Sequence, residues 1–440
     1  MVVAFALATA PASAAPTDAL QGEQWAVAPG TVFDLPGAWA LAAGAGVTVA
    51  VVDSGTRLDH ADLAPNAWTN FAEVPGNNVD DDANGYVDDV HGVDLTTKGA
   101  AQDLHDGYGH GTHVAGTIAA AANGRGVVGV AYRAKIMTVK VLDDQGGGTT
   151  GGVAEGIRYA AAMGARIINL SLEGNVDDPR MRTAIEAAAA ANALIVCSAG
   201  NSGVNVDQQP VYPVAIPASN VVGVAATEPD QGRSLPDFSN YGRLTVPVAA
   251  PGVEVISTSK SGGYEFKSGT SMAAPHVAGV AALMASVAPH LPAAELRAQL
   301  LQHATRGSVP VSAGYVDALG AVLAASGTAS YDRSQPPSLR VLSATRKGRT
   351  TQAQLAVLGA AGSVARIELR LDGRRVAQLR GGRTVLNVRL RNRAGRRLAV
   401  YALAADGRRL SRASARVRTL RSGKRHVGTG GGIGGAVWVG

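Results

Sequence analysis

The sequence is poor in cysteine and in aromatic residues, and each shortage excludes something. Cys197 is the only cysteine among 440 residues, so an internal disulfide is excluded and a hydrophobic core must stabilise the fold. Aromatic residues make up 4% of the chain, which makes nucleic acid an unlikely partner because few side chains could stack on bases. We also expect no membrane span, because we find no sufficiently long apolar run.

The composition favours a globular protein with two domains. Hydrophobic residues reach 46% and there are 55 glycines, which is typical of an alanine-rich α/β protein and not of a disordered chain. Residues 331–440 contain 24 Lys and Arg but 4 Asp and Glu, which leaves 16 and 30 for residues 1–330. A first part with a net charge of −14 therefore precedes a second part with +20, and this contrast predicts a boundary near residue 330.

Three segments predict the remaining boundaries. Val2 to Ala10 is a short apolar run followed by Ala12-Ser13-Ala14, so residues 1–15 resemble a signal peptide with its cleavage site and predict secretion. Residues 326–337 are rich in Gly, Ser and Pro and form the expected linker. Residues 421–440 are rich in glycine, and we expect a disordered tail there.

Apolar strand-like runs alternate with helix-like runs through residues 24–325. This alternation predicts an α/β domain with a doubly wound, mostly parallel sheet and helices on both faces. The expected strands cover residues 47–53, 136–142, 166–170, 193–198, 221–225 and 244–248, and the expected helices cover 151–163, 180–192 and 271–287.

Three separated motifs carry the chemistry. In Ser268–Gly279 a polar turn enters a helix, which puts the Ser271 hydroxyl near free backbone N–H groups that favour a developing anion. A serine needs a base, and His110 stands at the start of another helix in Gly-His-Gly-Thr-His. Asp53 ends the strand 47–53 and could orient the histidine. The three residues predict an Asp-His-Ser triad.

The order Asp53, His110, Ser271 and the sequences around these residues resemble the subtilisin-like serine proteases, or subtilases, over about residues 24–325. The resemblance implies an oxyanion hole at Asn201. It also implies that two segments line the pocket for the substrate residue before the scissile bond, P1, and these are Ser171, Leu172, Glu173 and Gly174 on one side and Ser198, Ala199 and Gly200 on the other.

Glu173 departs from the family pattern, which usually has glycine at this place. One interpretation is that its carboxylate lies at the rim of the pocket and favours a basic P1 residue. The other is that the side chain points to solvent and changes little. The sequence leaves both open.

An acidic segment predicts a calcium site. Oxygen-bearing residues alternate from Asp80, with Gly85 at the sixth position, as in calcium-binding loops. Position twelve is His91 instead of glutamate, so an EF-hand is excluded, and a solvated acidic loop is the alternative. The family often holds structural Ca²⁺. The candidate ligands are Asp80, Asp82, Asn84, Tyr86 and Asp88, with a second candidate site at Asp62 and Asn123.

Other reactive side chains have simpler interpretations. Cys197 lies in an apolar strand and reads as a small core residue. His113 shares a helix face with His110, which could suggest a metal pair, but no third ligand accompanies them, and packing is the alternative. His276 and His105 are expected in helix packing and on a loop surface.

Residues 338–420 predict a second, all-β domain. Short alternating runs are separated by turn signals such as Asp372-Gly373 and Asp406-Gly407, which predicts an Arg-rich β-sandwich. Its positive charge could attach the protein to anionic surfaces such as cell-envelope polymers, could dock this domain on the acidic catalytic domain, or could merely solvate the outer face of a sheet.

The sequence therefore predicts a secreted, monomeric serine endopeptidase that acts on proteins or peptides. One alternative is a catalytically silent subtilase shell whose basic domain binds anionic surfaces, but no triad residue is missing. Another is an esterase-type hydrolase, but such enzymes usually have a Gly-x-Ser-x-Gly elbow and a histidine later in the chain. In this chain the histidine, His110, comes earlier than the serine, and Ser271 is followed by Met272-Ala273 in place of the x-Gly of that elbow.

Overall fold

The computed structural model describes two compact units, Met1–Arg333 and Ser334–Gly440. In the first unit it describes residues 16–28, 31–97 and 102–327. In the second it describes residues 338–347, 350–358, 366–372, 374–380, 385–390, 397–403, 409–416 and 418–419. The expected signal peptide, most of the expected linker and the glycine-rich tail lie outside the described residues.

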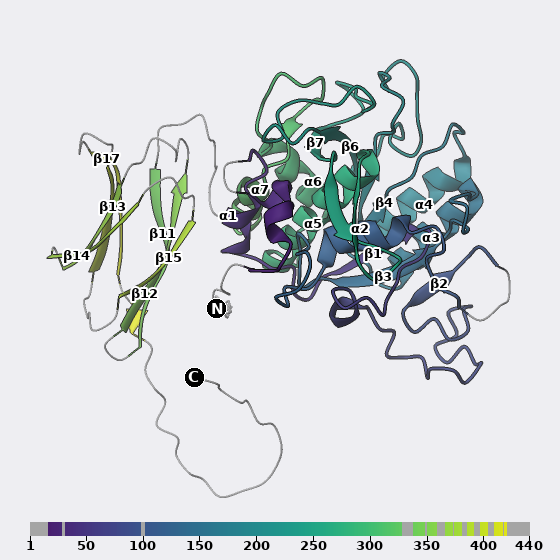
Figure 1. The fold of residues 1–440 in the computed structure, drawn as a ribbon, viewed down its shortest axis with the longest axis horizontal. Helices are drawn as coiled ribbons and strands as arrows, with labels where there is room; N and C mark the ends of the chain where they lie inside the picture. Colours follow the sequence, from purple (N-terminus) through teal and green to yellow (C-terminus); the bar gives the residue numbers. More distant parts are fainter. Residues whose placement is uncertain are drawn as a thin grey trace, which may run out of the picture. The chain divides into compact units, whose positions relative to one another are not determined.

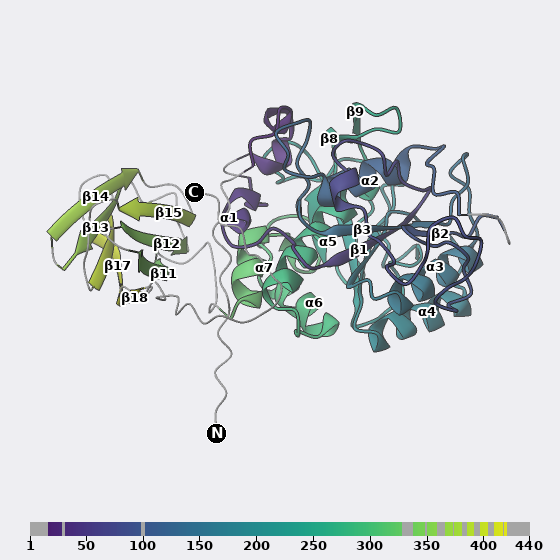
Figure 2. The same cartoon turned by 90° about the horizontal axis from the view of Figure 1, so that it is seen from below.

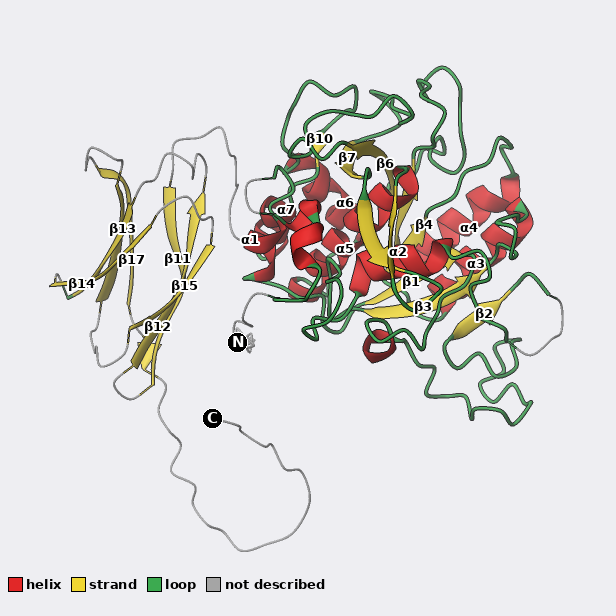
Figure 3. Ribbon diagram, in the orientation of Figure 1, coloured by secondary structure: helices red, strands yellow, loops and turns green. Residues whose placement is uncertain are grey.

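An eight-stranded sheet forms the centre of the first unit, and all its paired strands run parallel (Figures 1 and 3). The strand order is β10-β7-β6-β5-β4-β1-β3-β2. The strands are β1 (Thr48–Asp53), β2 (Gly92–Asp94), β3 (Lys135–Lys140), β4 (Ile167–Leu170), β5 (Leu194–Ser198), β6 (Val221–Thr227), β7 (Val248–Pro251) and β10 (Gly314–Tyr315). The predicted parallel sheet is confirmed.

Successive side chains of β1 enter two different cores, which gives the sheet a helical layer on each face. Val49 and Val51 join one core, while Ala50 and Val52 join the other. The first core is shared with helices α1 (Leu35–Trp39), α2 (His110–Ala119), α5 (Thr270–Val287), α6 (Ala293–Gln302) and α7 (Ala318–Ala325). The second core is shared with α3 (Thr150–Ala162) and α4 (Pro179–Ala190). Figure 2 shows α4 below β1 and β3 and α2 above them.

Several local features differ from the sequence expectation, and the short strands β2 and β10 and the helices α6 and α7 were not predicted. The strand expected at 244–248 begins only at Val248, because the preceding backbone turns around Asp207, whose carboxylate accepts the N–H groups of Leu244 and Thr245. A hairpin of β8 (Val255–Thr258) and β9 (Tyr264–Lys267) was not predicted. Short 3₁₀ turns occupy Gln21–Glu23, Trp25–Val27 and Ala64–Asn66.

Helix α5 contradicts the expectation that no apolar run is long enough to cross a membrane. It has the required length and hydropathy, but 83% of its 18-residue window is buried inside the structure. It packs against the strands β4 to β7 and against α2 and α7. Burial on most of its sides explains why it carries almost no polar face.

The second unit contains two four-stranded sheets, β15-β12-β11-β18 and β14-β13-β16-β17. Its strands are β11 (Ser338–Lys347), β12 (Thr350–Leu358), β13 (Arg366–Leu371), β14 (Arg374–Arg380), β15 (Val385–Leu390), β16 (Arg397–Leu403), β17 (Arg409–Arg416) and β18 (Arg418–Thr419). β11 contacts β16 and β17 of the other sheet, so the sheets pack against each other. The predicted small all-β sandwich is confirmed.

The strand pattern of this unit is the one expected for a sheet with one covered face. In β13 the side chains of Ile367, Leu369 and Leu371 are buried, whereas those of Arg366 and Arg370 are exposed. The aliphatic side chains thus face inward and the arginines outward, while Glu368 between them is buried by its ion pairs with Arg370 and Arg375.

Candidate active site

The candidate site lies where three neighbouring strands end. Asp53 is the last residue of β1, Ser171 directly follows β4, and Ser198 is the last residue of β5. Because β1, β4 and β5 are adjacent and parallel, their carboxyl ends meet at one edge of the sheet. The sequence thus brings residues far apart in the chain to one place.

His110 and Asp53 form a buried, hydrogen-bonded pair. The Nδ1 atom of His110 lies 2.8 Å from Oδ1 and 3.0 Å from Oδ2 of Asp53. The Asp53 side chain is fully buried, and the His110 side chain is 17% exposed. Burial lowers the pKa of His110, but the charge and the hydrogen bond of Asp53 raise it, and the net pKa lies above its ordinary value. Asp53 therefore orients the ring and stabilises its cation.

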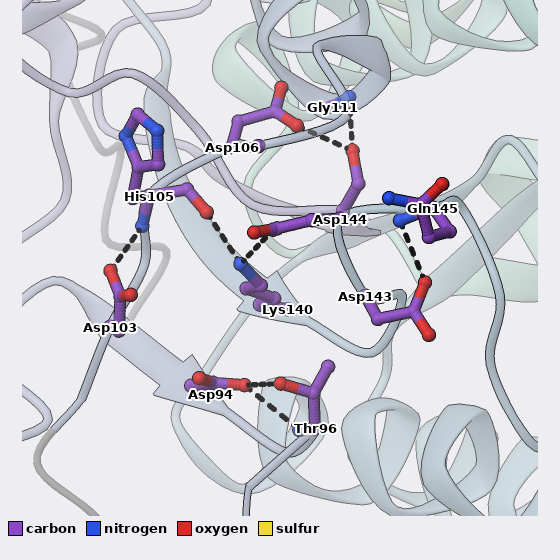
Figure 4. Close-up of polar contacts among 12 residues, drawn as sticks. Asp94, Thr96, Asp103, His105, Asp106, Gly111, Lys140, Asp143, Asp144 and Gln145 are labelled. Atoms are coloured by element: carbon purple, nitrogen blue, oxygen red, sulfur yellow. Dashed lines mark hydrogen bonds and ion pairs between the residues drawn. The ribbon is translucent and has the colours of Figure 1, made fainter.

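Asp106, which the sequence analysis missed, fixes the start of the helix that carries His110. Its Oδ2 accepts the backbone N–H and the hydroxyl of Thr112 at 2.7 and 2.6 Å, and its Oδ1 accepts the Ser54 hydroxyl at 2.7 Å. That hydroxyl in turn accepts the Gly111 N–H at 3.0 Å (Figure 4). A methyl group at Gly111 would overlap the Gly55 carbonyl, so glycine lets helix α2 approach β1 closely.

The loop that contains Asp106 is also tied to the end of β3. The Lys140 ammonium group, which is almost fully buried, donates to the His105 carbonyl at 2.6 Å and to Asp144 at 3.2 Å (Figure 4). The carbonyl of His105 thereby ties this loop to Lys140 at the end of β3. The side chain of His105 is exposed, as the sequence predicts.

Ser271 lies in the first turn of α5, and an interruption in that helix links it to Ser171. Pro275 has no N–H to donate to the carbonyl four residues earlier, which belongs to Ser271. The Ser171 hydroxyl donates to this carbonyl instead, at 2.7 Å, and is itself hydrogen-bonded at 2.9 Å by the Asn169 amide. Ser171 therefore satisfies a backbone group that a regular helix would satisfy itself.

The Ser271 hydroxyl donates to the Ser171 carbonyl at 3.2 Å. Among the described residues no hydrogen bond joins this hydroxyl to His110. Catalytic hydrogen bonds are often long or misaligned without substrate, and rotation about one side-chain bond redirects a serine hydroxyl.

Asn201 is held with its amide nitrogen available. Its Oδ1 accepts the Thr270 N–H at 2.8 Å and the Thr270 hydroxyl at 3.1 Å. Since the oxygen is occupied, the Nδ2 donor of this exposed side chain is free to point toward a ligand at Ser271. The Ser271 N–H is one of the first four that a helix leaves without an internal acceptor. The two N–H donors can therefore serve one oxyanion.

The two expected pocket segments lie side by side. The Ser198 hydroxyl donates to the Leu172 carbonyl at 3.1 Å, which joins the segment after β4 to the end of β5. Gly174 pairs with Tyr212 through two backbone hydrogen bonds of 2.9 Å. Ala199 is buried and its N–H donates to Val224 of β6. Each wall is thus anchored to the central sheet.

The remaining reactive side chains have structural roles. His113 is buried and its Nε2 lies 3.0 Å from the Val255 carbonyl and 3.2 Å from the Glu265 carbonyl, so it packs against the hairpin β8–β9. Burial lowers the pKa of His113 to about 3 and that of His276 to about 4, which keeps both rings neutral. Cys197 is buried, and burial raises the pKa of its thiol to about 12.

The acidic loop satisfies many of its carboxylates with its own backbone. Asp80 accepts the N–H groups of Asn84 and Gly85, and Asp88 accepts those of residues 76 to 78. The Tyr86 hydroxyl donates to Glu155, away from the other candidate ligands. Of the predicted ligands in this loop, Asp82 is the one that joins a cluster of acids.

That cluster consists of Glu73, Asp82 and Asp89, whose carboxylate oxygens lie within 4.8 Å of one another. The Asn70 amide bridges two of them, since it donates to Asp82 and to Asp89 at 2.9 Å each. Asn84 donates to Asp89 as well. Glu73 and Asp89 were not predicted as ligands, because neither residue fits the alternating pattern.

The structure adds a third residue, Asp18, to the second predicted metal site at Asp62 and Asn123. Asn123 donates to Asp62 at 3.0 Å, as expected from their pairing. Asp18, which the sequence analysis missed, accepts the N–H groups of Asn123 and Gly124 on Oδ1, while its Oδ2 is buried without a hydrogen-bond partner. Burial and the charge of Asp62 raise the pKa of Asp18 above its ordinary value. These acids and amides are ligands that Ca²⁺ prefers, and a cation would satisfy the unpartnered oxygen.

Comparison with known proteins assigns the first unit. Residues 44–329 match the model of the subtilase family, peptidase S8. The chain belongs to the subtilase family. It is 40% identical to thermitase of Thermoactinomyces vulgaris over 252 residues, which cover 57% of this chain and 79% of thermitase. It is 37% identical to subtilisin DY of Bacillus licheniformis over 60% of this chain and 85% of that protein.

A solved structure agrees with this assignment. The structure of a protease from Pseudoalteromonas arctica PAMC 21717 is similar with a TM-score of 0.58 and 32% identity, over 71% of this chain and 100% of that one. As a member of the subtilases the chain is a serine endopeptidase of the subtilisin type. The predicted family and enzyme class are confirmed.

The His110–Asp53 pair gives a prediction about pH. We expect Asp53→Asn to lower kcat by about 10⁴-fold, because the imidazole loses the partner that fixes its tautomer.

In the unsubstituted enzyme the raised His110 pKa means that activity falls with decreasing pH at a pH above the ordinary histidine pKa. Initial rates between pH 5 and 9 measure this. An acid limb below the ordinary histidine pKa would contradict it.

Proposed function

We propose that Ser271, His110 and Asp53 hydrolyse peptide bonds by acyl transfer. Ser271 attacks the carbonyl carbon of the scissile bond while His110 accepts its proton, and Asp53 holds the imidazole and stabilises its cation. The Asn201 amide and the Ser271 N–H stabilise the negative oxygen of the tetrahedral intermediate. His110 then protonates the leaving amine, and a water molecule deprotonated by His110 releases the acyl group.

The observation that carries this proposal is the buried His110–Asp53 hydrogen bond at the sheet edge where Ser271 begins a helix. The alternative of a silent shell lacks support, because none of the three side chains is missing and each is held by neighbours. The enzyme class found by comparison favours a working protease.

Cleavage of denatured casein by the full chain tests this mechanism. We expect Ser271→Ala to abolish cleavage, because no nucleophile remains, and Asn201→Ala to lower kcat by about 10²- to 10³-fold through loss of one oxyanion donor. Cys197→Ala, which changes a buried thiol, serves as the control and should leave the rate unchanged. Undiminished cleavage by Ser271→Ala would exclude the proposed nucleophile.

We further propose that Ca²⁺ stabilises the fold at Asp18, Asp62 and Asn123. The support is the unpartnered buried oxygen of Asp18 beside a second carboxylate. The cluster Glu73, Asp82 and Asp89 is a second candidate, although hydrogen bonds from Asn70 and Asn84 already reach it. In both places the ion would neutralise acids that otherwise repel each other.

The two candidate calcium sites can be separated by substitution. We expect calcium to raise the melting temperature of the full chain, and Asp18→Asn to remove most of that increase, whereas the surface control Glu295→Gln keeps it. Because the raised Asp18 pKa favours a bound proton, the calcium effect should weaken as the pH falls. Calorimetry with calcium or EDTA measures this. A calcium effect lost in Asp82→Asn but kept in Asp18→Asn would move the proposal to the acidic loop.

The location of the enzyme is inferred from its amino-terminal sequence. We propose that the enzyme is secreted, which rests on the apolar run Val2 to Ala10 and the small residues after it. Purification from the medium of an expressing host, with an amino terminus after Ala14, would support secretion. Protein found only inside the cells would contradict it.

We also propose that the second unit binds anionic polymers of the cell envelope. Residues 331–440 carry a net charge of +20, and the arginines at positions 366, 370, 374, 375 and 397 are exposed. Positive charge on one unit favours attachment to a polyanion, whereas the first unit, with −14, does not.

Binding of the full chain to a polyanion tests this role. We expect retention on immobilised polyphosphate that decreases steeply with salt, and weaker retention for the double substitution Arg374→Glu, Arg375→Glu. The matched control is Arg125→Glu and Arg133→Glu in the first unit. Retention reduced equally by both pairs would indicate a non-specific charge effect and contradict a role for the second unit.

A further inference from the structure

The position of the P1 side chain follows from the position of the oxyanion donors. If the scissile carbonyl carbon lies at Ser271 with its oxygen toward Asn201, the adjacent P1 residue lies beside the segment that ends in Asn201. The neighbouring walls are formed by residues 171–174 and 198–200, which the Ser198–Leu172 hydrogen bond holds side by side. A P1 residue in this position therefore lies next to these two walls.

The carboxylate of Glu173 reaches across from one wall to the other. Gly200 has a φ of +102°, and a methyl group there would overlap Oε2 of Glu173 and the amide nitrogen of Asn240. The Glu173 carboxylate thus lies over the bare Cα of Gly200. Only glycine both adopts this backbone conformation easily and leaves the space that the carboxylate occupies.

Glu173 also differs from the acids that follow it in having no cationic partner among the described residues. The next two acids in the chain are paired, Asp177 with Arg182 at 2.5 Å and Asp178 with Arg180 at 2.6 Å. Within the part of the chain that the structure describes, Glu173 has no ion pair, and its side chain is exposed. The Asn240 amide donates to the Ala199 carbonyl at 2.9 Å, and among the described residues no hydrogen bond joins it to the Glu173 carboxylate.

We propose that Glu173 makes the enzyme prefer substrates with arginine or lysine at P1. The side chain of such a residue would extend between the walls and bring its cation to the carboxylate over Gly200. Aromatic P1 residues would instead place an apolar ring against an exposed negative charge, without compensation. The inference rests on the proposed roles of Ser271 and Asn201. Solvent screening reduces such a charge effect but does not reverse its direction.

The experiment uses peptides that differ only at P1, which is Arg, Lys, Gln or Phe. We expect the ratio of kcat/KM for the Arg peptide to that for the Phe peptide to fall by about fivefold in Glu173→Gln. This change keeps the size of the side chain and removes its charge. The ratio should also fall with added salt in the unsubstituted enzyme. Glu186→Gln, an exposed carboxylate on α4, is the matched control and should leave the ratio unchanged.

Three outcomes would overturn the inference or its foundation. Equal turnover of the Arg and Phe peptides by an enzyme that cleaves casein would disprove the role of Glu173 and leave the proposed function intact. An unchanged ratio in Glu173→Gln, with a changed ratio in Glu173→Gly, would show that size and not charge selects the substrate. Cleavage of the Arg peptide by Ser271→Ala at the unsubstituted rate would overturn the proposed function itself.

Discussion

The parallel pairing of β1, β4 and β5 is the constraint on which the rest of the site depends. Val51 pairs with Asn169, and Asn169 pairs with Val196, so the three strands end at nearly the same level. A strand that slipped by one residue would turn every buried side chain to the opposite core. The two cores therefore fix the strand ends, and the strand ends fix which side chains meet Ser271.

A second dependence concerns the carbonyl of Ser271. Pro275 leaves this carbonyl without its helical partner, and the hydroxyl of Ser171 takes that place. One hydrogen bond thus attaches the nucleophile's helix to the wall of the substrate pocket. Because Asn201 binds Thr270 on the other side, the start of α5 is held by residues from two strand ends. The helix start is thus positioned by segments that follow the sheet as well as by its own hydrogen bonds.

Strong local patterns made much of this predictable. Side-chain contacts between residues far apart in the sequence could not be predicted. The strand containing Asp53 and the helices that begin near His110 and Ser271 follow from apolar runs and glycine-bearing turns. The role of Asp18 was not predicted because its partner Asn123 is 105 residues away. The role of Asp106 was not predicted because it depends on a turn that only folding creates. The strand at 244–248 was misplaced because Asp207, far away in the sequence, turns that backbone. An alternating pattern suggested Asp88 as a ligand, but local amides bind it.

The imidazole of His113 has a consequence for how the site moves. It lies one turn after His110 on α2 and contacts the carbonyls of Val255 and Glu265, one on each strand of the hairpin that leads to Ser271. The helix carrying the base and the chain entering the nucleophile's helix are therefore coupled by this uncharged ring and by the hydroxyls of Ser257 and Thr258, which donate to the carbonyls of His113 and Thr112. A displacement of α2 without the hairpin would break these hydrogen bonds, so the contacts favour joint movement of the two halves of the site.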